Sequence, residues 1–197
     1  MKELILVRHG ETDFNTQGRY QGAIDTDLNE NGRLQAMQVA VALRDRPFDV
    51  LASSPLKRAV QTAEVIARET DKRIVLADEF VERNLGVFEG LNREEAQTRF
   101  PHLWNRLIAK HMFHAPDGGE SLCACTYRVW LGIDRLNREY PGKRVLVVSH
   151  AAVARVVRGR FVQMTNEEFA AYVLGNGQWV SYPGFQAAGD DYTEKIA

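Results

Sequence analysis

The stretch LILVRHGET, residues 4–12, is an apolar run that ends abruptly at an arginine and a histidine. The residues from Leu4 to Val7 are continuously apolar, which is typical of a strand buried on both faces of a parallel sheet. In open α/β sheets the ligand site lies beyond the carboxyl ends of the strands. We therefore expect Arg8 and His9 to stand where such a fold builds its functional site.

Short apolar segments alternate with amphipathic segments along the rest of the chain. Further strands are predicted over residues 48–53, 73–78, 143–149 and 178–182, and helices over residues 27–43, 54–69, 123–138 and 151–161. Because strands and helices alternate and the strands are continuously apolar, we expect a sheet that is covered by helices on both faces. The sequence thus indicates the α/β class.

Two of the predicted helices carry recognisable start signals. Asn29 is expected to be the N-cap of the first helix, and Ser54 to cap the second, with Pro55 at its first helical position. The helical spacing of the apolar residues in the first helix predicts its buried face, which would consist of Leu28, Leu34, Met37, Val41 and Leu43.

The length of 197 residues fits one large domain with a modest insertion. We expect this domain to span residues 1–186, with an inserted cover segment at 91–121, and a polar tail at 187–197. The cover segment is rich in histidine, arginine and aromatic residues and could fold over the site. Alternatively it is a solvated helical excursion with Trp104 and Phe113 packed inward.

Charge and composition narrow the class of partners. The formal net charge is -1, so no long-range field attracts nucleic acid or an anionic membrane. Because no apolar run reaches the roughly 20 residues that span a bilayer, and the N-terminal residues lead straight into a strand, we expect a cytoplasmic protein. Cys123 and Cys125 are predicted to be reduced packing residues. Nothing in the sequence specifies an oligomeric state.

Two further basic side chains are expected at the same edge of the sheet as Arg8 and His9. Arg58 lies in the helix after the second predicted strand, and His150 directly follows the strand at 143–149. Two arginines and two histidines in one crevice make a local electropositive pocket, which suits a phosphate dianion. Two neighbouring guanidinium groups would repel a zinc ion, so no metal is expected.

The motifs LVRHGET followed by Asn15, SSPLKRAVQTAE and VVSHAAV resemble those of the histidine phosphatase superfamily, which includes the cofactor-dependent phosphoglycerate mutases. The resemblance implies a three-layer α/β/α sandwich with a mostly parallel mixed sheet, as in phosphoglycerate mutase. It implies that His9 is the nucleophile and that other residues hold the phosphoryl group, namely Arg8, Asn15, Arg58 and His150.

The resemblance also implies a glutamate that donates a proton. The segment ERNLGVFEG, residues 82–90, contains the matching pattern, with Phe88 in place of the usual tryptophan. Its spacing favours Glu82 over the competing candidates Glu79 and Glu89. Gln21, together with Arg19 and Tyr20, could line the opposite lip of the pocket.

The residue types predict a metal-independent phosphomonoesterase without a cofactor. A neutral imidazole at His9 would attack phosphorus and form a phosphohistidine, while Glu82 acts first as acid and then as base. The backbone N–H of Ala151 is expected to assist phosphate binding. Alanine stands there in place of a family glycine, which is harmless if residue 151 opens a helix with negative φ. A small phosphorylated metabolite is the expected substrate.

Two other functions remain open on the sequence. A phosphoglycerate mutase would use the same catalytic residues, but the segment between Glu82 and His150 is shorter than expected for an enzyme that must keep water from its phosphoenzyme. An inactive phosphate-binding or scaffold protein would be expected to have lost His9, His150 or Glu82, and all three are present.

Overall fold

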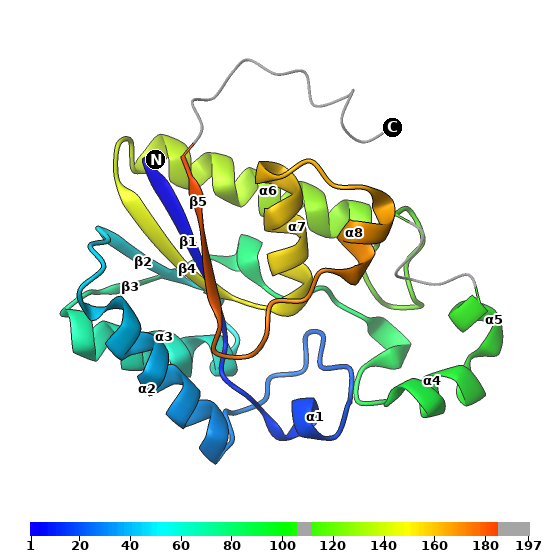
Figure 1. Ribbon diagram of the computed structural model, residues 1–197. Coiled ribbons are helices and arrows are strands. Elements are labelled where there is room, and N and C mark those ends of the chain that lie inside the picture. Colours follow the sequence, from blue (N-terminus) through cyan, green and yellow to red (C-terminus); the bar gives the residue numbers. More distant parts are fainter. Residues whose placement is uncertain (106–111, 185–197) are drawn as a thin grey trace.

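The computed structural model of the chain describes residues 1–105 and 112–184. In these residues a central sheet has the strand order β3-β2-β4-β1-β5 (Figure 1). Its strands are β1 (Glu3–Arg8), β2 (Val50–Ser53), β3 (Ile74–Leu76), β4 (Arg144–Ser149) and β5 (Trp179–Pro183). Strand β5 runs antiparallel to β1, and the other neighbouring strands are parallel. The predicted mostly parallel mixed sheet is confirmed.

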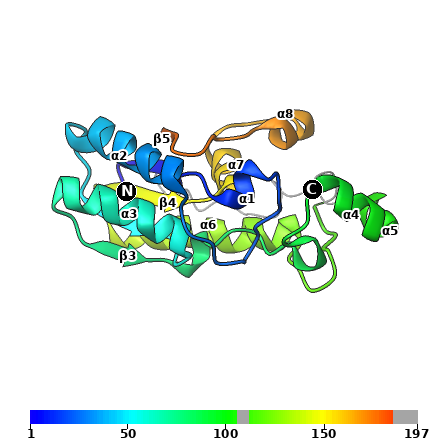
Figure 2. The same cartoon turned by 90° about the horizontal axis from the view of Figure 1, so that it is seen from below.

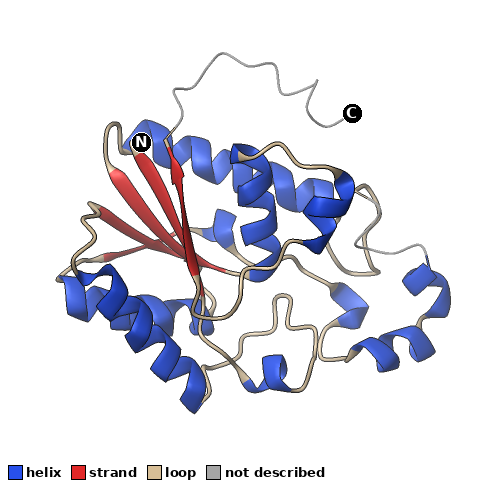
Figure 3. Cartoon of the chain, in the orientation of Figure 1, coloured by secondary structure: helices blue, strands red, loops and turns tan. Residues whose placement is uncertain are grey.

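Long helices cover both faces of the sheet (Figure 3). Helices α2 (Glu30–Arg44) and α3 (Lys57–Thr70) pack on one face, and α6 (Leu122–Glu139) and α7 (Ala151–Phe161) on the other. The shorter helices are α1 (Asp13–Thr16), α4 (Arg93–Arg99), α5 (Pro101–Asn105) and α8 (Asn166–Ala171), with 3₁₀ turns at Asp78–Phe80 and Gly86–Phe88. The predicted α/β/α sandwich is therefore confirmed.

Each central strand divides its side chains between two cores. In β1, Leu4 and Leu6 pack toward α6 and α7, whereas Ile5 and Val7 pack toward α2 and α3. All four side chains are fully buried. Because successive side chains of a strand point to opposite faces, a strand with a core on each side must be continuously apolar. This requirement explains the run before Arg8.

The predicted buried face of α2 is partly wrong. Asn29 caps the helix as expected, since its side chain accepts a hydrogen bond from the Gly32 N–H. However, Leu34, Met37 and Val41 are about half exposed, with exposed fractions of 59%, 47% and 50%. The buried side is made of Ala36, Val39, Ala40 and Leu43. Small residues allow α2 to approach its neighbours closely, and this preference outweighs side-chain hydrophobicity.

The predicted start of α3 is also wrong. The helix begins at Lys57, with Leu56 as N-cap and no side-chain cap, so Ser54 and Pro55 precede it. The hydroxyl of Ser54 instead lies 2.7 Å from a ring nitrogen of His150. The Ser54 side chain, which the local sequence predicts to be a helix cap, therefore forms a tertiary contact with His150.

The segment expected to form a cover contains α4 and α5, which stand apart from the sandwich with α1 between them and the sheet (Figures 1 and 2). Trp104 is half-buried, but Phe113 is 70% exposed, so the expected inward packing fails for Phe113. Residues 106–111 of this segment and the predicted tail at 187–197 lie outside the described residues.

The two cysteines are free thiols, in agreement with the predicted packing role. Cys123 and Cys125 form no disulfide, and Cys125 lies on the buried face of α6, where burial raises the pKa of its thiol to about 12. Across residues 1–105 and 112–184, no helix is both long and apolar enough to span a membrane.

Candidate active site

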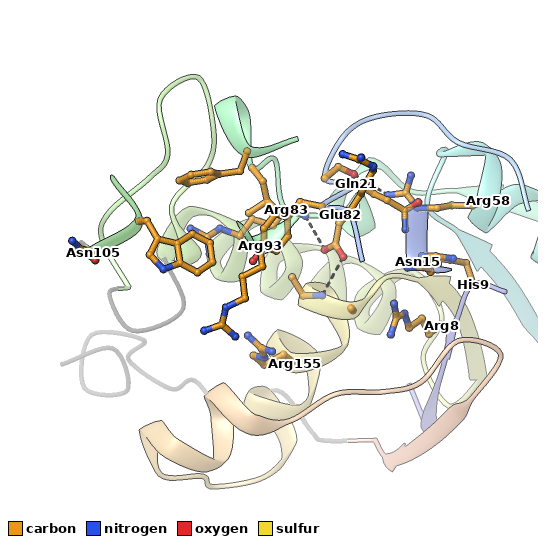
Figure 4. A pocket seen from close by; sticks show the side chains of 18 residues that line it. Arg8, His9, Asn15, Gln21, Arg58, Glu82, Arg83, Arg93, Asn105 and Arg155 are labelled. Atoms are coloured by element: carbon orange, nitrogen blue, oxygen red, sulfur yellow. Dashed lines mark hydrogen bonds between the residues drawn. The ribbon is translucent and has the colours of Figure 1, made fainter. Parts of the chain in front are cut away.

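The carboxyl ends of β1, β2 and β4 meet at a pocket with a volume of about 680 Å³. Strand β1 pairs with β4 so that Arg8 stands opposite Ser149, which brings the following residues, His9 and His150, together. Their ring centroids are 5.2 Å apart. Arg58 enters from the first turn of α3, and Figure 4 shows it with Arg8 and His9 at one end of the pocket.

Glycine is required where the loop after β1 meets α2. A Cβ atom on Gly10 would lie 2.2 Å from the Gly32 carbonyl oxygen, and one on Gly32 would lie 2.0 Å from the Glu11 carbonyl oxygen. The two backbones therefore touch directly, which no side chain would allow. The contact holds the peptide next to His9 against the N-terminus of a core helix.

His9 is held in one tautomer by its own loop. Its Nδ1 atom lies 2.6 Å from the carbonyl oxygen of Gly10, which can only accept a hydrogen bond. Nδ1 must therefore carry the proton, and in the neutral ring Nε2 keeps its lone pair. Burial, followed by the charges of Arg58 and Arg8, holds the pKa of His9 well below its usual value. The ring is thus neutral and nucleophilic at physiological pH.

His150 is fixed by the serine before α3. Ser54 Oγ accepts from the Leu56 N–H at 3.4 Å and lies 2.7 Å from His150 Nε2. When the serine hydroxyl donates to Nε2, the proton of the neutral ring resides on Nδ1. This Nδ1 atom is buried and has no hydrogen-bond partner among the described residues. Burial and the charge of Arg58 hold the pKa of His150 well below its usual value.

The two arginines are anchored through backbone carbonyl groups. Arg58 is fully buried and donates to the carbonyl oxygens of Ile24 at 2.7 Å and Gly22 at 2.8 Å. Arg8 donates to the Leu174 carbonyl oxygen at 2.7 Å. Neither forms an ion pair with a carboxylate in the described part of the chain. Both guanidinium groups are therefore positioned without a direct carboxylate partner, which is the state expected of an anion site.

The predicted polar residues on the opposite side also reach the pocket. Asn15 and Gln21 line it, and both are tied to Thr12: Asn15 Oδ1 accepts from the Thr12 N–H, and Gln21 Oε1 accepts from the Thr12 hydroxyl. Arg19 and Tyr20 line it as well. The sequence-predicted lip is thus brought to the pocket.

Of the three candidate glutamates, only Glu82 lines the pocket. Its carboxylate accepts from the backbone N–H groups of Arg83 at 2.8 Å and Ala152 at 3.2 Å. Glu79 instead pairs with Arg135 on the outside of α6, which holds the pKa of the Glu79 carboxyl below its usual value. Glu89 accepts from backbone N–H groups of the surrounding loops. Of the three candidates, Glu82 is therefore the one placed to reach a ligand in the pocket.

Ala151 is the first residue of α7 and lines the pocket. It is not among the residues with positive φ, so an alanine side chain fits without strain. The helix has no side-chain cap. The Ala152 N–H already donates to Glu82, and the Ala151 N–H lies at the same helix N-terminus beside the pocket, where it can stabilise negative charge.

The sequence signature of the histidine phosphatase superfamily, branch 1, matches residues 4–185. The chain belongs to the histidine phosphatase superfamily. It is 40% identical over 152 residues to a protein of Bacillus subtilis named "Uncharacterized phosphatase PhoE", covering 77% of this chain and 73% of that protein. It is 32% identical over 179 residues to phosphoserine phosphatase 1 of Hydrogenobacter thermophilus, covering 91% and 85%.

Solved structures of this histidine phosphatase fold are also similar. A mycobacterial glucosyl-3-phosphoglycerate phosphatase in complex with VO3 superposes with a TM-score of 0.83, covers 92% of each chain and is 27% identical. A putative α-ribazole-5′-P phosphatase of Escherichia coli K-12 gives a TM-score of 0.83 at 27% identity, covering 91% of this chain and 89% of its own. The chain is a phosphatase of the histidine phosphatase type.

Several residues of this histidine phosphatase site escaped sequence reasoning. Ser54 reads as a helix cap, and Asn176, which donates to the carbonyl oxygen of His9 at 3.1 Å, lies in a loop far along the chain. Arg155 could have been found, because it lies four residues after Ala151 on the same face of a helix that begins at the site. Within the described residues, no three histidine, cysteine or acidic side chains are grouped to hold a metal ion.

Proposed function

We propose that this phosphatase hydrolyses the phosphomonoester of a small metabolite through a phosphohistidine at His9, without a metal ion. One observation carries the proposal: His9 has its Nδ1 proton committed to the Gly10 carbonyl oxygen, and it lines a pocket together with the buried, unpaired guanidinium group of Arg58. That arrangement leaves Nε2 as the nucleophile beside a site for phosphoryl oxygens.

In the first step, the lone pair of His9 Nε2 forms a bond to phosphorus while the ester P–O bond breaks. The electron pair of that bond goes to the departing oxygen, and Glu82 supplies the proton that makes it an alcohol. Arg8, Arg58 and the N-terminus of α7 are suited to stabilise the charge on the equatorial oxygens during the transfer.

In the second step, a water molecule loses a proton to the Glu82 carboxylate and attacks phosphorus. The P–N bond breaks, its electron pair returns to Nε2, and inorganic phosphate leaves. His150 supports both steps, because a proton on its Nδ1 atom can be donated to a phosphoryl oxygen while Ser54 holds the other side of the ring.

The proposal is tested with p-nitrophenyl phosphate in the presence and absence of a chelator. We expect wild-type turnover to be unchanged by the chelator and to fall at least about a thousandfold in His9→Ala, with labelled phosphate trapped on His9 of the wild-type protein. His102→Ala is the matched control, since His102 is exposed on α5 and does not line the pocket. Turnover that requires a metal, or that survives in His9→Ala, would contradict the proposal.

The substrate class follows from the size and charge of the pocket and from the relatives, which are named as phosphatases of phosphoserine and of glucosyl-3-phosphoglycerate. The same catalytic residues would serve a phosphoglycerate mutase. An assay on 3-phosphoglycerate with 2,3-bisphosphoglycerate separates the two activities. We expect phosphate release to exceed isomerisation, and the reverse result would favour the mutase.

A further inference from the structure

The outer end of the pocket carries its own pair of arginines. Arg155 comes from α7, one turn beyond Ala151, and Arg93 is the first residue of α4. Both line the pocket, and Figure 4 shows their guanidinium groups extending into the same part of it, away from His9. They are therefore separate from the residues to which the proposed phosphoryl transfer is assigned.

These two guanidinium groups are held in place without being neutralised. The ring of Trp104 lies under the guanidinium carbon of Arg93 at 5.6 Å, and the Nε atom of Arg155 donates to the Tyr172 carbonyl oxygen at 3.2 Å. Neither forms an ion pair with a carboxylate in the described ranges. Arginines elsewhere on the surface do so, for example Arg135 with Glu79.

The charge lining the pocket is unbalanced even after a phosphate is bound. Six arginines line it, of which Arg19 forms an ion pair with Glu95, whereas Glu82 is the one acidic side chain that lines the pocket among the described residues. One phosphate dianion at the inner end would be met by Arg8 and Arg58. In the proposed mechanism Glu82 carries a proton when the ester bond breaks, so it cannot compensate the outer pair at that moment.

Burial makes this imbalance costly at Arg155. The side chain is half-buried, and desolvation lowers the pKa of its guanidinium group, with only the Glu82 charge acting in the opposite direction. A buried charge is normally paired. A ligand anion would supply the missing partner.

We infer that the substrate carries a second anionic group, a carboxylate or a second phosphate, which binds between Arg93 and Arg155 while the scissile phosphate occupies the inner end. The inference rests on the proposed function and specifies its substrate class. Planar guanidinium groups can contact either kind of anion through two parallel N–H···O bonds. Trp104, which lies under Arg93, also contacts the rings of Tyr20 and Phe88, and these three pocket-lining side chains would contact the part of the substrate between its charges.

The test compares substrates that differ only in the second group. Phosphate release is measured for 3-phosphoglycerate against glycerol 3-phosphate, and for fructose 1,6-bisphosphate against fructose 6-phosphate. In one of the two pairs, we expect kcat/KM to be at least about tenfold higher for the substrate that carries the second anionic group. A tenfold difference is the value of one charge-assisted contact. The first pair reports a carboxylate and the second a phosphate.

Variants locate the preference. Arg155→Gln and Arg93→Gln should each reduce the ratio of kcat/KM within the preferred pair by about tenfold, through KM. Arg155→Lys should restore part of the ratio. Arg99→Gln is the matched control on α4, because Arg99 is exposed and does not line the pocket.

The outcomes are distinct from those that test phosphatase activity. Absence of a preference in both pairs, or a preference that persists in both glutamine variants, would overturn the inference even if p-nitrophenyl phosphate is hydrolysed. Calorimetric titration of His9→Ala protein with the same pairs measures the preference without turnover. The titration therefore tests the second anion site even if the protein does not hydrolyse phosphomonoesters.

Discussion

The inner and outer ends of the pocket are built in different ways. At the inner end, His9, Arg58 and His150 are at most 2% exposed and follow directly from strands or helices of the core. At the outer end, Arg93 is exposed on a short helix, which is tied to the opposite lip by the ion pair of Arg19 with Glu95 at 2.7 Å. The inner end is therefore built by core packing, whereas at the outer end Arg155 lies on the core helix α7 and Arg93 on a segment that can change without disturbing the core.

The largest effect should come from Glu82→Gln, which keeps the shape of the inner end but removes the proton donor. We expect hydrolysis of alkyl phosphates to fall about 10²- to 10⁴-fold. The kcat/KM for p-nitrophenyl phosphate, which reports the transfer to His9 and not the later attack of water, should fall much less, because its leaving group needs no proton. Glu79→Gln, outside the pocket, is the control. Equal losses on both kinds of substrate would mean that Glu82 acts otherwise than as an acid.

Arg58→Met should affect both catalysis and folding. We expect kcat/KM to fall about 10²- to 10³-fold because a donor to the phosphoryl group is lost. The free energy of unfolding should fall by about 1–3 kcal/mol because the buried carbonyl groups of Gly22 and Ile24 lose their donor. Steady-state kinetics and urea denaturation measure these effects. Lys57→Met, on the neighbouring exposed position, should change neither.

Ser54→Ala should produce a smaller loss. Without the hydroxyl, His150 loses the hydrogen bond that orients its ring, and we expect kcat/KM to fall about tenfold, the equivalent of one hydrogen bond. The pH profile should also change, since the bond selects the tautomer. Ser53→Ala removes a hydroxyl that donates only to a backbone carbonyl and should leave the profile intact. An unchanged profile in Ser54→Ala would reject the positioning role.

The free energy of unfolding should depend on pH through the two buried histidines of the inner end. The pKa of His9 and of His150 is well below 6.5 in the folded chain and returns to about 6.5 on unfolding. The unfolded chain therefore binds more protons below pH 6.5, so the free energy of unfolding decreases as pH falls through that value and is retained above it. Urea denaturation at pH 7.5 and 5.5 measures the decrease. His150→Asn should reduce it, and a pH-independent wild-type stability would contradict this account.

The smallest effect is expected from Trp104→Ala at the outer end. Trp104 is half-buried and contacts Phe88 and Arg93, so we expect a cost of about 1 kcal/mol in unfolding and p-nitrophenyl phosphate turnover within about threefold of wild type. By contrast, Phe88→Ala, which removes a fully buried side chain, should lower the free energy of unfolding by about 3–5 kcal/mol. A large loss of p-nitrophenyl phosphate turnover in Trp104→Ala would remove the distinction between the two ends.

Sequence reasoning performed well where side chains follow buried strands. Arg8, His9 and His150 stand at strand ends that continuous apolar runs locate, so their meeting followed from the topology. It performed poorly on α2, where the sequence is apolar around much of the helix and gives no unique face. Spacing predicts that Leu34 is buried, but it faces outward, because the small residues of α2 form the packed face.

Residues contributed by loops and by the outer helices were harder to predict. Asn176 contacts His9 and Ser54 contacts His150, and each pair is more than ninety positions apart in the chain. The local sequence pattern does not predict contacts over such separations. Glu82 could be preferred over Glu79 only by resemblance until the structure paired Glu79 with Arg135. Periodicity reports which face a residue occupies, but not which distant residue it meets.

Apolar continuity and motif order in the chain were sufficient for the α/β sandwich and for the group of residues around His9, because burial on both faces of a sheet leaves few alternative arrangements. Folding in three dimensions settled the tautomer of His9, placed only Glu82 of the three candidate glutamates at the pocket, and brought Arg93 and Arg155 together at the outer end. These depend on hydrogen bonds and charges between segments that are remote in the chain, whose distances arise only when the layers pack.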